Sequence, residues 1–452
     1  MKSINPATNQ IIQEYHEYSS QEVESILASV NEDWLGWKQQ SIEDRAVCMH
    51  KAADLLLEHR DECARIITSE MGKLIKESRA EVEKCALVCR TFADEAVDIL
   101  RDQAVVTDFK KSLVAFEPLG IILAVMPWNF PFWQVWRFIA PALMAGNAAV
   151  LKHASNVSGC ALKIEEIVRQ AGFPQNLFRS LLISSGKVEA VVSNPLVKAV
   201  TLTGSEPAGA KVAAVAGNQL KKSVLELGGS DPFIVLEDAD LDKAIQTSIT
   251  ARLLNAGQVC ISAKRFIVME AVAEQFIARQ KALMESLVVD DPMEETTQLA
   301  PMSREDLLEE VHEQVERSIA AGAQLVTGGK RLDRPGNFYA PTILTQVKKG
   351  MPAYDDEIFG PVSAIITVKS EEEAIEVAND TPFGLGASVW TKDENKGERL
   401  ARKIESGMVF VNSMVVSHPK LPFGGIKRSG YGRECSDYGM KEFVNIKTIC
   451  VK

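Results

Sequence analysis

The sequence has no apolar run long enough to cross a membrane. Its longest such run, residues 120–126, has the length of a single strand and ends at Pro127, whereas a membrane-spanning helix needs about 18 or more apolar residues. The amino-terminal stretch MKSINPATNQ also lacks the apolar segment of a secretory signal. These absences predict a cytoplasmic protein that neither crosses nor binds a membrane.

The sequence is also short of positive charge. It carries 50 Lys and Arg residues against 61 Asp and Glu residues, a formal net charge of −11 at pH 7. Binding to nucleic acid depends largely on Lys and Arg side chains that neutralise phosphates. The balance therefore argues against a nucleic-acid partner, although it leaves room for a local basic pocket.

Clustered metal ligands and paired cysteines are missing as well. The six histidines show no ligand spacing, and the eight cysteines are dispersed along 452 residues. Cys85 and Cys89 are one helical turn apart, but no histidine or second cysteine pair lies beside them in the sequence, so packing is the better interpretation. We expect reduced thiols, no disulfide framework and no bound metal.

What the chain does have is a regular alternation of strand and helix patterns. Helices are expected at 42–59, 61–77, 81–100 and 131–143, the last with Pro131 in its first turn. From residue 121 to 216, and again from about 225 to 404, short apolar strands alternate with helices. This alternation predicts an α/β fold of two or three domains, built on parallel sheets that bind ligands at the carboxyl ends of their strands.

One cysteine stands in a setting that suits a nucleophile. Cys260 lies in NAGQVCISAKR, residues 255–265, between a flexible Gly257 and the basic pair Lys264 and Arg265. A thiol attacks as its thiolate, and nearby cations or a base lower its pKa. Most free cysteines are inert packing residues, so this stretch alone leaves both interpretations open.

Four further segments bear functional groups, two of them at predicted strand ends. Gly204 and Ser205 precede a helix whose N-terminus could bind a pyrophosphate, and Lys152 ends a strand within reach of a ribose or phosphate. Glu226 stands between two leucines, where burial would raise its pKa toward that of a general base. Asn129, between prolines and aromatic residues, could donate to an oxyanion. The alternatives are a plain turn, a solvated lysine, a buried ion pair and a turn-forming asparagine.

Taken in order, these segments resemble the aldehyde dehydrogenase superfamily over essentially the whole chain. The matching motifs are PWNFP at 127–131, LKHAS at 151–155, TGS at 203–205, LELGGSDP at 225–232, GQVC at 257–260, EIFGP at 357–361 and PFGGIKRSG at 422–430. Chance agreement of so many ordered motifs is negligible. The resemblance implies two parallel-sheet α/β domains, one for NAD(P) and one catalytic, with a β oligomerisation arm.

The resemblance also implies a role for each matching residue. Cys260 would attack the aldehyde to give a thiohemiacetal, and Asn129 with the backbone N–H of Cys260 would hold the oxyanion. Glu226 would activate the water that hydrolyses the thioester left after hydride transfer. The implied cofactor contacts are Trp128, Lys152, Ser155, Gly204, Ser205, Leu227, Glu357 and Phe359.

One departure from the superfamily pattern bears on the cofactor. Many members have Lys-Pro-Ser-Glu where this chain has Lys152-His153-Ala154-Ser155. The usual glutamate would bond the adenine ribose 2′-hydroxyl and repel a 2′-phosphate. Ser155 removes that repulsion, so we expect NADP to be accepted alongside NAD or preferred to it. Lys152 would pair with the phosphate, and His153 would either assist or face away.

The substrate is indicated by the helix that follows Asn129. Trp133 and Arg137 are four residues apart and share a face. A buried arginine that faces a pocket suits the carboxylate of a substrate. A structural ion pair between Arg137 and an acidic residue of the protein is an equally good interpretation. The stretches WNFPFWQVWRF and KHASN resemble the bacterial succinate-semialdehyde dehydrogenase branch. That resemblance implies that Arg137, with Ser417 as a second contact, binds the far carboxylate of succinate semialdehyde; glutarate semialdehyde and a general aldehyde stay open.

The resemblance further implies how the chain is divided. Residues 1–107 and 127–226 would form the NAD(P)-binding domain, 227–433 the catalytic domain, and 108–126 with 434–452 an oligomerisation arm. The free edge strand of such an arm would pair with a second subunit in a homodimer or homotetramer.

Two rival functions remain at this point. A CoA-acylating dehydrogenase would have no need of the water-activating Glu226. A catalytically silent binding protein would have no need of Cys260, Glu226 and Asn129 together.

Overall fold

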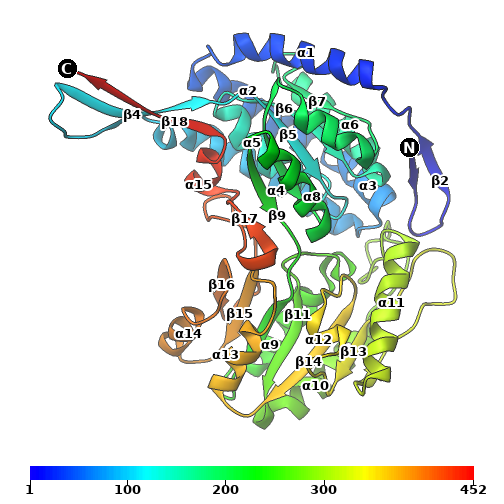
Figure 1. The fold of residues 1–452 in the computed structure, drawn as a ribbon. Coiled ribbons are helices and arrows are strands. Elements are labelled where there is room, and N and C mark those ends of the chain that lie inside the picture. Colours follow the sequence, from blue (N-terminus) through cyan, green and yellow to red (C-terminus); the bar gives the residue numbers. More distant parts are fainter.

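The fold is organised around two β-sheets, one above the other in the view of Figure 1. The computed structural model describes all residues from Met1 to Lys452. The blue, cyan and first green parts of the chain form the upper unit, and the later green, yellow and orange parts form the lower one (Figure 1). The red carboxyl-terminal part returns to the upper unit and continues into a projecting arm (Figure 1).

The upper unit holds a six-stranded sheet with the order β17-β9-β8-β5-β6-β7. Five strands are parallel, and only the short β17 is antiparallel to its neighbour. The bounds are β5 (Ile121–Met126), β6 (Ala148–His153), β7 (Phe178–Ser180), β8 (Val197–Thr203), β9 (Lys222–Glu226) and β17 (Gly430–Tyr431). The strand order reverses between β5 and β8, and doubly wound sheets bind ligands at such a reversal.

The carboxyl ends of these strands gather the predicted cofactor and catalytic segments at one edge. Lys152 lies near the end of β6, Gly204 follows β8, and Glu226 ends β9. Thr203 and Glu226 are partners in register on neighbouring strands. Because neighbouring strands are about 5 Å apart, groups distant in the sequence become neighbours here.

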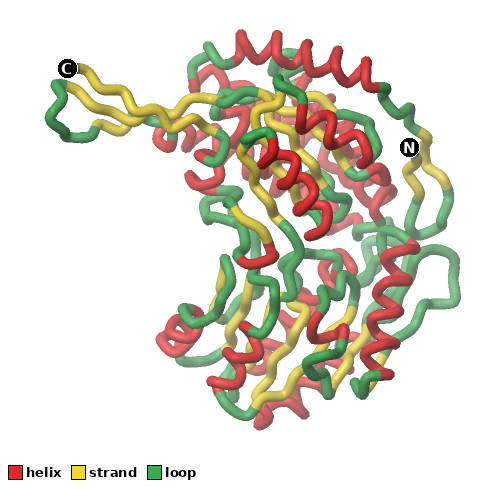
Figure 2. The backbone as a smooth tube through the Cα atoms, viewed as in Figure 1, coloured by secondary structure: helices red, strands yellow, loops and turns green.

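Helices surround this sheet (Figure 2). Their bounds are α1 (Ser20–Trp37), α2 (Ile42–Glu58), α3 (Arg60–Met71), α4 (Ile75–Ile99), α5 (Trp133–Met144), α6 (Ser158–Gln170), α7 (Val188–Ser193) and α8 (Glu206–Asn218). A hairpin of β1 (Lys2–Ile4) and β2 (Ile11–Glu14) precedes them. Every residue of α5 is buried, and this helix packs against α4 and α2.

Three helix boundaries differ from the expectations by more than one residue. The helix expected at 61–77 ends at Met71, because Gly72 adopts a left-handed conformation with φ 87° and terminates α3. The helix expected at 81–100 begins at Ile75, soon after this break. Helix α5 begins at Trp133, so Pro131 precedes the first turn instead of lying within it. These differences arise from backbone geometry that apolar periodicity does not report.

The lower unit holds a seven-stranded sheet with the order β12-β13-β14-β11-β10-β15-β16. All neighbours are parallel except the edge strand β12. The bounds are β10 (Asp231–Val235), β11 (Ala263–Met269), β12 (Gln324–Thr327), β13 (Thr342–Thr345), β14 (Val362–Val368), β15 (Gly386–Trp390) and β16 (Met408–Val411). Ile234 and Phe233, adjacent on β10, enter different cores, so this sheet is buried on both faces.

The helices of the lower unit lie between or beside these strands. Their bounds are α9 (Leu241–Leu253), α10 (Glu270–Glu285), α11 (Glu305–Ala320), α12 (Pro352–Asp355), α13 (Glu371–Asn379) and α14 (Glu394–Ala401). None of the helices in the structure combines the length and apolar character that a membrane crossing requires.

The arm is a three-stranded antiparallel sheet. It consists of β3 (Gln103–Ala104), β4 (Lys111–Pro118) and β18 (Val444–Val451), and the last follows α15 (Ser436–Lys441). Residues 121–126 were expected in the arm, and this assignment is wrong. They form β5, which pairs with β6 and β8 inside the upper sheet, since this apolar run is buried between two neighbours.

Candidate active site

Cys260 lies in a loop between α9 and β11 that has an unusual backbone. Asn255, Ala256 and Gly257 have φ values of 53°, 54° and 75°. A left-handed conformation costs a residue with a side chain roughly 1–2 kcal/mol, so surrounding contacts must hold the loop. Gly257 has no room for a side chain, because a Cβ there would lie 2.3 Å from the carbonyl oxygen of Gly360.

Buried side chains supply the contacts that hold this loop. Arg252 Nη2 donates to the carbonyl oxygen of Gly257 at 2.7 Å. Asn255 Nδ2 donates to the carbonyl oxygen of Asn129 at 2.9 Å, and Asn129 Nδ2 donates to that of Gln258 at 2.9 Å. The loop of the lower unit is thereby tied to the PWNFP segment of the upper unit, and the two units meet beside the thiol.

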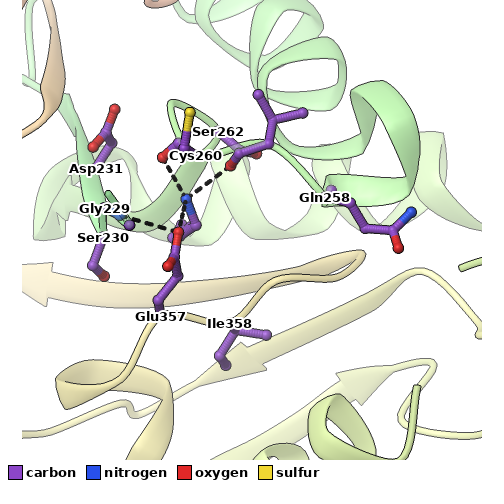
Figure 3. Close-up of polar contacts among 12 residues, drawn as sticks. Gly229, Ser230, Asp231, Gln258, Cys260, Ser262, Glu357 and Ile358 are labelled. Atoms are coloured by element: carbon purple, nitrogen blue, oxygen red, sulfur yellow. Dashed lines mark hydrogen bonds and ion pairs between the residues drawn. The ribbon is translucent and has the colours of Figure 1, made fainter. Parts of the chain in front are cut away.

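Lys264 and Glu357 support the same loop, and Glu357 lies below it in the view of Figure 3. Lys264 Nζ donates to the carbonyl oxygens of Val259 at 2.9 Å and Cys260 at 2.7 Å, and lies 3.1 Å from Glu357 Oε1. The same oxygen of Glu357 accepts from the backbone N–H of Gly229 at 3.1 Å. The Cys260 sulfur points away from Glu357 (Figure 3), so this network holds the backbone and leaves the thiol free.

The expected lowering of the thiol pKa by the basic pair is absent. Burial raises the pKa of Cys260 to about 11, against the pull of Lys264 and Arg137. Arg265, the other member of the pair, donates to two carbonyl groups of α13 and does not face the thiol. The thiol is therefore protonated at neutral pH in the protein alone.

A cavity of about 100 Å³ adjoins Cys260. Its wall is largely apolar, and it also contains Trp133, Arg137 and Ser417. The structure thus brings the three predicted substrate residues to the same cavity as the predicted nucleophile. The buried Oγ of Ser417 has no hydrogen-bond partner in the protein, so it is available to a ligand. Lys84, which the sequence did not single out, lines the cavity as well.

Arg137 both lines the cavity and forms a buried ion pair. Its guanidinium contacts the carboxylate of Glu434, and both side chains are almost inaccessible to solvent. The guanidinium also lies 4.3 Å from the ring centroid of Phe423, and its Nε donates to no protein acceptor. The ion pair that was the alternative interpretation is present, and it coexists with a position at the cavity.

Glu226 is buried without any hydrogen-bond partner for its carboxylate oxygens. Burial and then repulsion by Glu434 raise the pKa of Glu226 well above its usual range, against the pull of Arg137. The carboxylate lies beside Gly424, where an added Cβ would come within 2.6 Å of Oε1. It makes no hydrogen bond with Cys260, and its raised pKa makes the carboxylate, once ionised, a stronger base than a solvent-exposed glutamate.

The oxyanion donors that the resemblance implied lie close to the nucleophile. Asn129 Oδ1 accepts from Gln134 Nε2 at 3.0 Å, which orients the amide. One hydrogen of Asn129 Nδ2 goes to Gln258, so the other remains available. The backbone N–H of Cys260 has no protein acceptor either.

The predicted cofactor residues surround the carboxyl edge of the upper sheet. Lys152 is half-buried and forms no ion pair, and burial lowers the pKa of its ammonium group. Ser155 is exposed at the start of a short 3-10 helix. Ser205 stands at the N-cap position of α8, and its side chain makes no capping hydrogen bond. No carboxylate influences Lys152, so this edge fits a phosphate group.

Three other predicted cofactor residues pack at this edge. The rings of Trp128 and Phe359 meet edge to face with centroids 5.9 Å apart. Leu227 lies against α8, where a Cβ on Gly209 would come within 2.5 Å of its side chain. These apolar side chains lie on segments that flank the polar strand ends.

His153 faces away from the cofactor edge. Its Nε2 lies 2.9 Å from the carbonyl oxygen of Pro131, and its Nδ1 accepts from the backbone N–H of Ala154 at 3.0 Å. Burial lowers its pKa to about 4. It is a neutral residue that joins two loops and does not assist a phosphate.

Sequence reasoning missed three charged residues of the site, Lys84, Arg252 and Glu434. Arg252 carried a usable signal, because it is a charged residue in a largely apolar run eight positions before Cys260. Lys84 and Glu434 carried none, since each reaches the site only through the packing of α4 or of the segment before α15.

The fold and the site together define a class. Two α/β sheets meet beside a buried thiol, and the strand ends of the upper sheet carry a lysine without a carboxylate partner. The chain belongs to the aldehyde dehydrogenase family, whose family model matches residues 1–449. The expected superfamily and the expected fold class are thereby confirmed.

Individual relatives are similar over their full length. A Synechocystis protein named as a probable NADP(+)-using succinate-semialdehyde dehydrogenase is 52% identical over 449 residues, 99% of each chain. The NADP(+)-using succinate-semialdehyde dehydrogenase 1 of Mycobacterium tuberculosis is 48% identical over 452 residues, again 99% of each. The crystal structure of succinic semialdehyde dehydrogenase from Streptococcus pyogenes with NADP+ superposes with a TM-score of 0.98 at 41% identity, covering 100% of this chain and 99% of that one.

Proposed function

We propose that the protein oxidises succinate semialdehyde to succinate and that NADP accepts the hydride. The observation that carries this proposal is the cavity that Cys260 shares with Arg137 and Ser417. An aldehyde at the thiol would direct a short chain toward a cationic and a hydroxyl group, which suits a terminal carboxylate. Relatives that are 48–52% identical bear the name of this activity, which supports the same assignment.

The chemistry we assign begins at Cys260. Its sulfur bonds to the aldehyde carbon as the thiol proton passes to solvent water. The carbon–oxygen π bond breaks, and its electron pair makes the carbonyl oxygen an oxyanion. The free hydrogen of Asn129 Nδ2 and the backbone N–H of Cys260 stabilise that oxyanion, because both donors are fixed before the reaction. The oxidised cofactor NADP+, when bound, would supply the acceptor for the hydride that this carbon loses.

Glu226 serves the second half of the reaction. The enzyme then carries a thioester at Cys260, and water must attack its carbonyl carbon. Glu226 takes a proton from that water, and the Cys260 sulfur leaves with the electrons of the carbon–sulfur bond. A carboxylate with an unpaired, buried environment and a raised pKa suits this task. A base for water also argues against transfer of the acyl group to CoA.

We assign the adenosine phosphate of NADP to Lys152 and Ser155. Lys152 is a cation without a carboxylate partner, and Ser155 offers a hydroxyl where a glutamate would repel a phosphate. Gly204 and Ser205, at the N-terminus of α8, would receive the pyrophosphate. Glu357, Trp128, Phe359 and Leu227 would hold the nicotinamide half.

The division of labour in the chain is part of the proposal. The upper unit would bind NADP, the lower unit would provide Cys260, and the arm would pair with a second subunit in a homodimer or homotetramer. The exposed edge of β18 supports such a pairing, because an unpaired strand edge readily accepts another strand.

The test is a comparison of initial rates with two aldehydes and two cofactors. Succinate semialdehyde and butanal have equal chain lengths, and reduced cofactor is followed by its absorbance. We expect kcat/KM to favour the acid by at least about 10-fold, equivalent to about 1.4 kcal/mol, and to favour NADP over NAD. Equal rates for the two aldehydes would point to a broad aldehyde dehydrogenase, and higher rates with a five-carbon semialdehyde would point to glutarate semialdehyde.

A further inference from the structure

The positive charge of Arg137 is already neutralised by a carboxylate of the protein, that of Glu434, when no substrate is bound. Its guanidinium contacts the carboxylate of Glu434, and both groups are buried. Glu226 lies close enough to interact electrostatically with the same arginine. A substrate carboxylate at Arg137 would therefore be a further anion beside a single cation, and a buried anion without a counter-charge is costly.

Lys84 is the cavity residue whose charge has no partner. It comes from α4, lines the cavity with Cys260, and is half-buried. No carboxylate lies within ion-pair distance of its ammonium group, and it makes no hydrogen bond to the protein. Its Nζ lies 4.2 Å from the ring centroid of Trp133, which orients the ammonium across the cavity wall without neutralising it.

The opposite arrangement is found at Lys73, eleven residues earlier. That lysine is also buried and also lies over an aromatic ring, that of Phe130, but it is paired with Glu81. Glu81 and Glu83, the acidic residues just before Lys84 on α4, are thus paired with Lys73 and Arg60. The charge of Lys84, which lines the cavity, is therefore not neutralised by a carboxylate of the protein.

We propose that Lys84 is the specificity-determining cation that binds the remote carboxylate of the substrate, while Arg137 and Ser417 direct its geometry. The ligand class is a short aldehyde with an anionic group at the far end. This inference rests on the proposed function, since it names the group that selects the acid. Arg137 can still donate from Nε, but the net charge that offsets the substrate anion comes from Lys84.

The experiment compares Lys84→Met, which removes the charge with little change of length, and Lys84→Arg, which keeps it. Each is assayed with succinate semialdehyde and with butanal. We expect Lys84→Met to raise KM and lower kcat/KM for the acid at least about 10-fold, with butanal changed less than about 2-fold. Lys84→Arg should retain most of the preference for the acid.

Lys38→Met is a matched control, because Lys38 lies over the ring of Trp34 at 4.5 Å outside the cavity. This variant loses a lysine–aromatic contact of the same kind and should keep the wild-type preference. Thermal melting of all variants reports whether α4 and α5 still pack.

The pH dependence of the preference gives a second readout. Burial and the charge of Arg137 lower the pKa of Lys84 to about 8, while Cys435, Cys85 and Glu81 act in the other direction. The cation is present below that pH and lost above it. The preference for the acid over butanal should therefore fall as pH rises through about 8, and should persist there in Lys84→Arg, because arginine stays charged.

The outcomes separate the two proposals. If the wild-type enzyme prefers the acid and Lys84→Met keeps that preference, the role of Lys84 is overturned and the proposed function stands. An equal loss for both aldehydes would make Lys84 a packing residue and would also overturn the inference. If the wild-type enzyme shows no preference for the acid, the substrate assignment fails and the role of Lys84 fails with it.

Discussion

At Cys260, burial and nearby cations act on the thiol in opposite directions, and burial has the larger effect. Lys264 donates its hydrogen bonds to the carbonyl oxygens of Val259 and Cys260. It therefore stabilises the backbone of the loop more than it would stabilise a thiolate at Cys260. The result is a pKa of about 11 in the protein without ligands. Such a thiol is protected from adventitious oxidation, since the thiolate is the reactive form.

This protonated state predicts how the thiol reacts with iodoacetamide. The rate of alkylation at Cys260 should rise about 10-fold for each pH unit between 7 and 10, because the thiolate fraction rises in that proportion below the pKa. Mass spectrometry of the peptide that contains Cys260 measures the rate, with Cys260→Ala as the background. A plateau reached below pH 8 would show that the cations dominate instead.

Glu226 and Glu434 are a pair of buried carboxylates, and their repulsion raises the pKa of Glu226. If Glu226 activates water as we propose, this repulsion affects the pH range of that step. A general base acts when deprotonated, so a raised pKa moves the rise of kcat to higher pH. In Glu434→Gln the repulsion is gone and Arg137 is free to stabilise the Glu226 carboxylate. The pH at which kcat reaches half its maximum should therefore decrease.

Saturating succinate semialdehyde isolates kcat in that pH profile. Glu442→Gln is the control, because Glu442 contributes the smallest of the repulsions on Glu226 and should shift the profile less. A Glu434→Gln profile that coincides with the wild-type profile would contradict the coupling.

The position of Ser155 predicts that one added negative charge will change the cofactor preference from NADP toward NAD. Ser155→Glu should lower kcat/KM for NADP at least about 10-fold and leave NAD unchanged or improved, since a carboxylate repels the 2′-phosphate and accepts from a ribose hydroxyl. Ser155→Ala removes the hydroxyl without adding charge, so kcat/KM should still be higher with NADP than with NAD. Initial rates at varied concentrations of NADP and NAD measure this preference. If Ser155→Glu keeps the wild-type preference for NADP, the 2′-phosphate does not bind beside Ser155.

At the scale of elements, the start of α5 depends on a charge carried by α4. Glu81 accepts from the backbone N–H groups of Phe132 at 2.9 Å and Trp133 at 3.0 Å, where α5 has no capping side chain. The same carboxylate pairs with the fully buried Lys73. Glu81 therefore holds the helix that carries Trp133 and Arg137 into the cavity.

Glu81→Ala should destabilise the protein by about 3–5 kcal/mol, because it leaves Lys73 as a buried charge without a partner. Urea unfolding followed by tryptophan fluorescence measures the loss. Glu83→Ala on the same helix removes only a surface ion pair with Arg60 and should change the free energy of unfolding by less than about 1 kcal/mol. Equal effects of the two substitutions would show that the buried pair is not the anchor of α5.

At the scale of the whole molecule, the arm is the part that lacks a core of its own. Most residues of β18 are exposed, including Ile446, Ile449 and Val451. A two- or three-stranded ribbon with such a surface is marginal alone in water, and Figure 1 shows it projecting from the body. A second subunit would cover both its edge and its apolar residues.

Ile446→Lys should therefore shift the protein toward a monomer, because it places a charge in the surface that we propose to be buried between subunits. Sedimentation velocity over a range of concentrations measures the shift. Leu220→Lys changes an equally apolar and more exposed residue of the body and should leave the assembly unaltered. A monomeric wild-type protein would contradict the proposed role of the arm.

Much of the fold was predictable from the sequence because its signals are local. The alternation of strands and helices, and β5 in particular, follow from apolar runs of strand length bounded by turns. The neighbours of β13, β14 and β16 in the lower sheet do not follow from such local signals. Their place in the sheet depends on pairing with strands far away in the chain, which composition alone does not report.

By itself, the sequence determined the family and the identity of the residues that carry the assigned chemistry, since ordered motifs around Cys260, Glu226 and Asn129 are local patterns. Only the tertiary structure decided the charge balance of the cavity. The pairing of Arg137 with Glu434, the missing partner of Lys84 and the raised pKa of Cys260 all depend on distances between segments and on exclusion of water. The strength of an electrostatic interaction depends on the distance between the charges and on their burial. Neither quantity can be deduced from the amino-acid sequence alone.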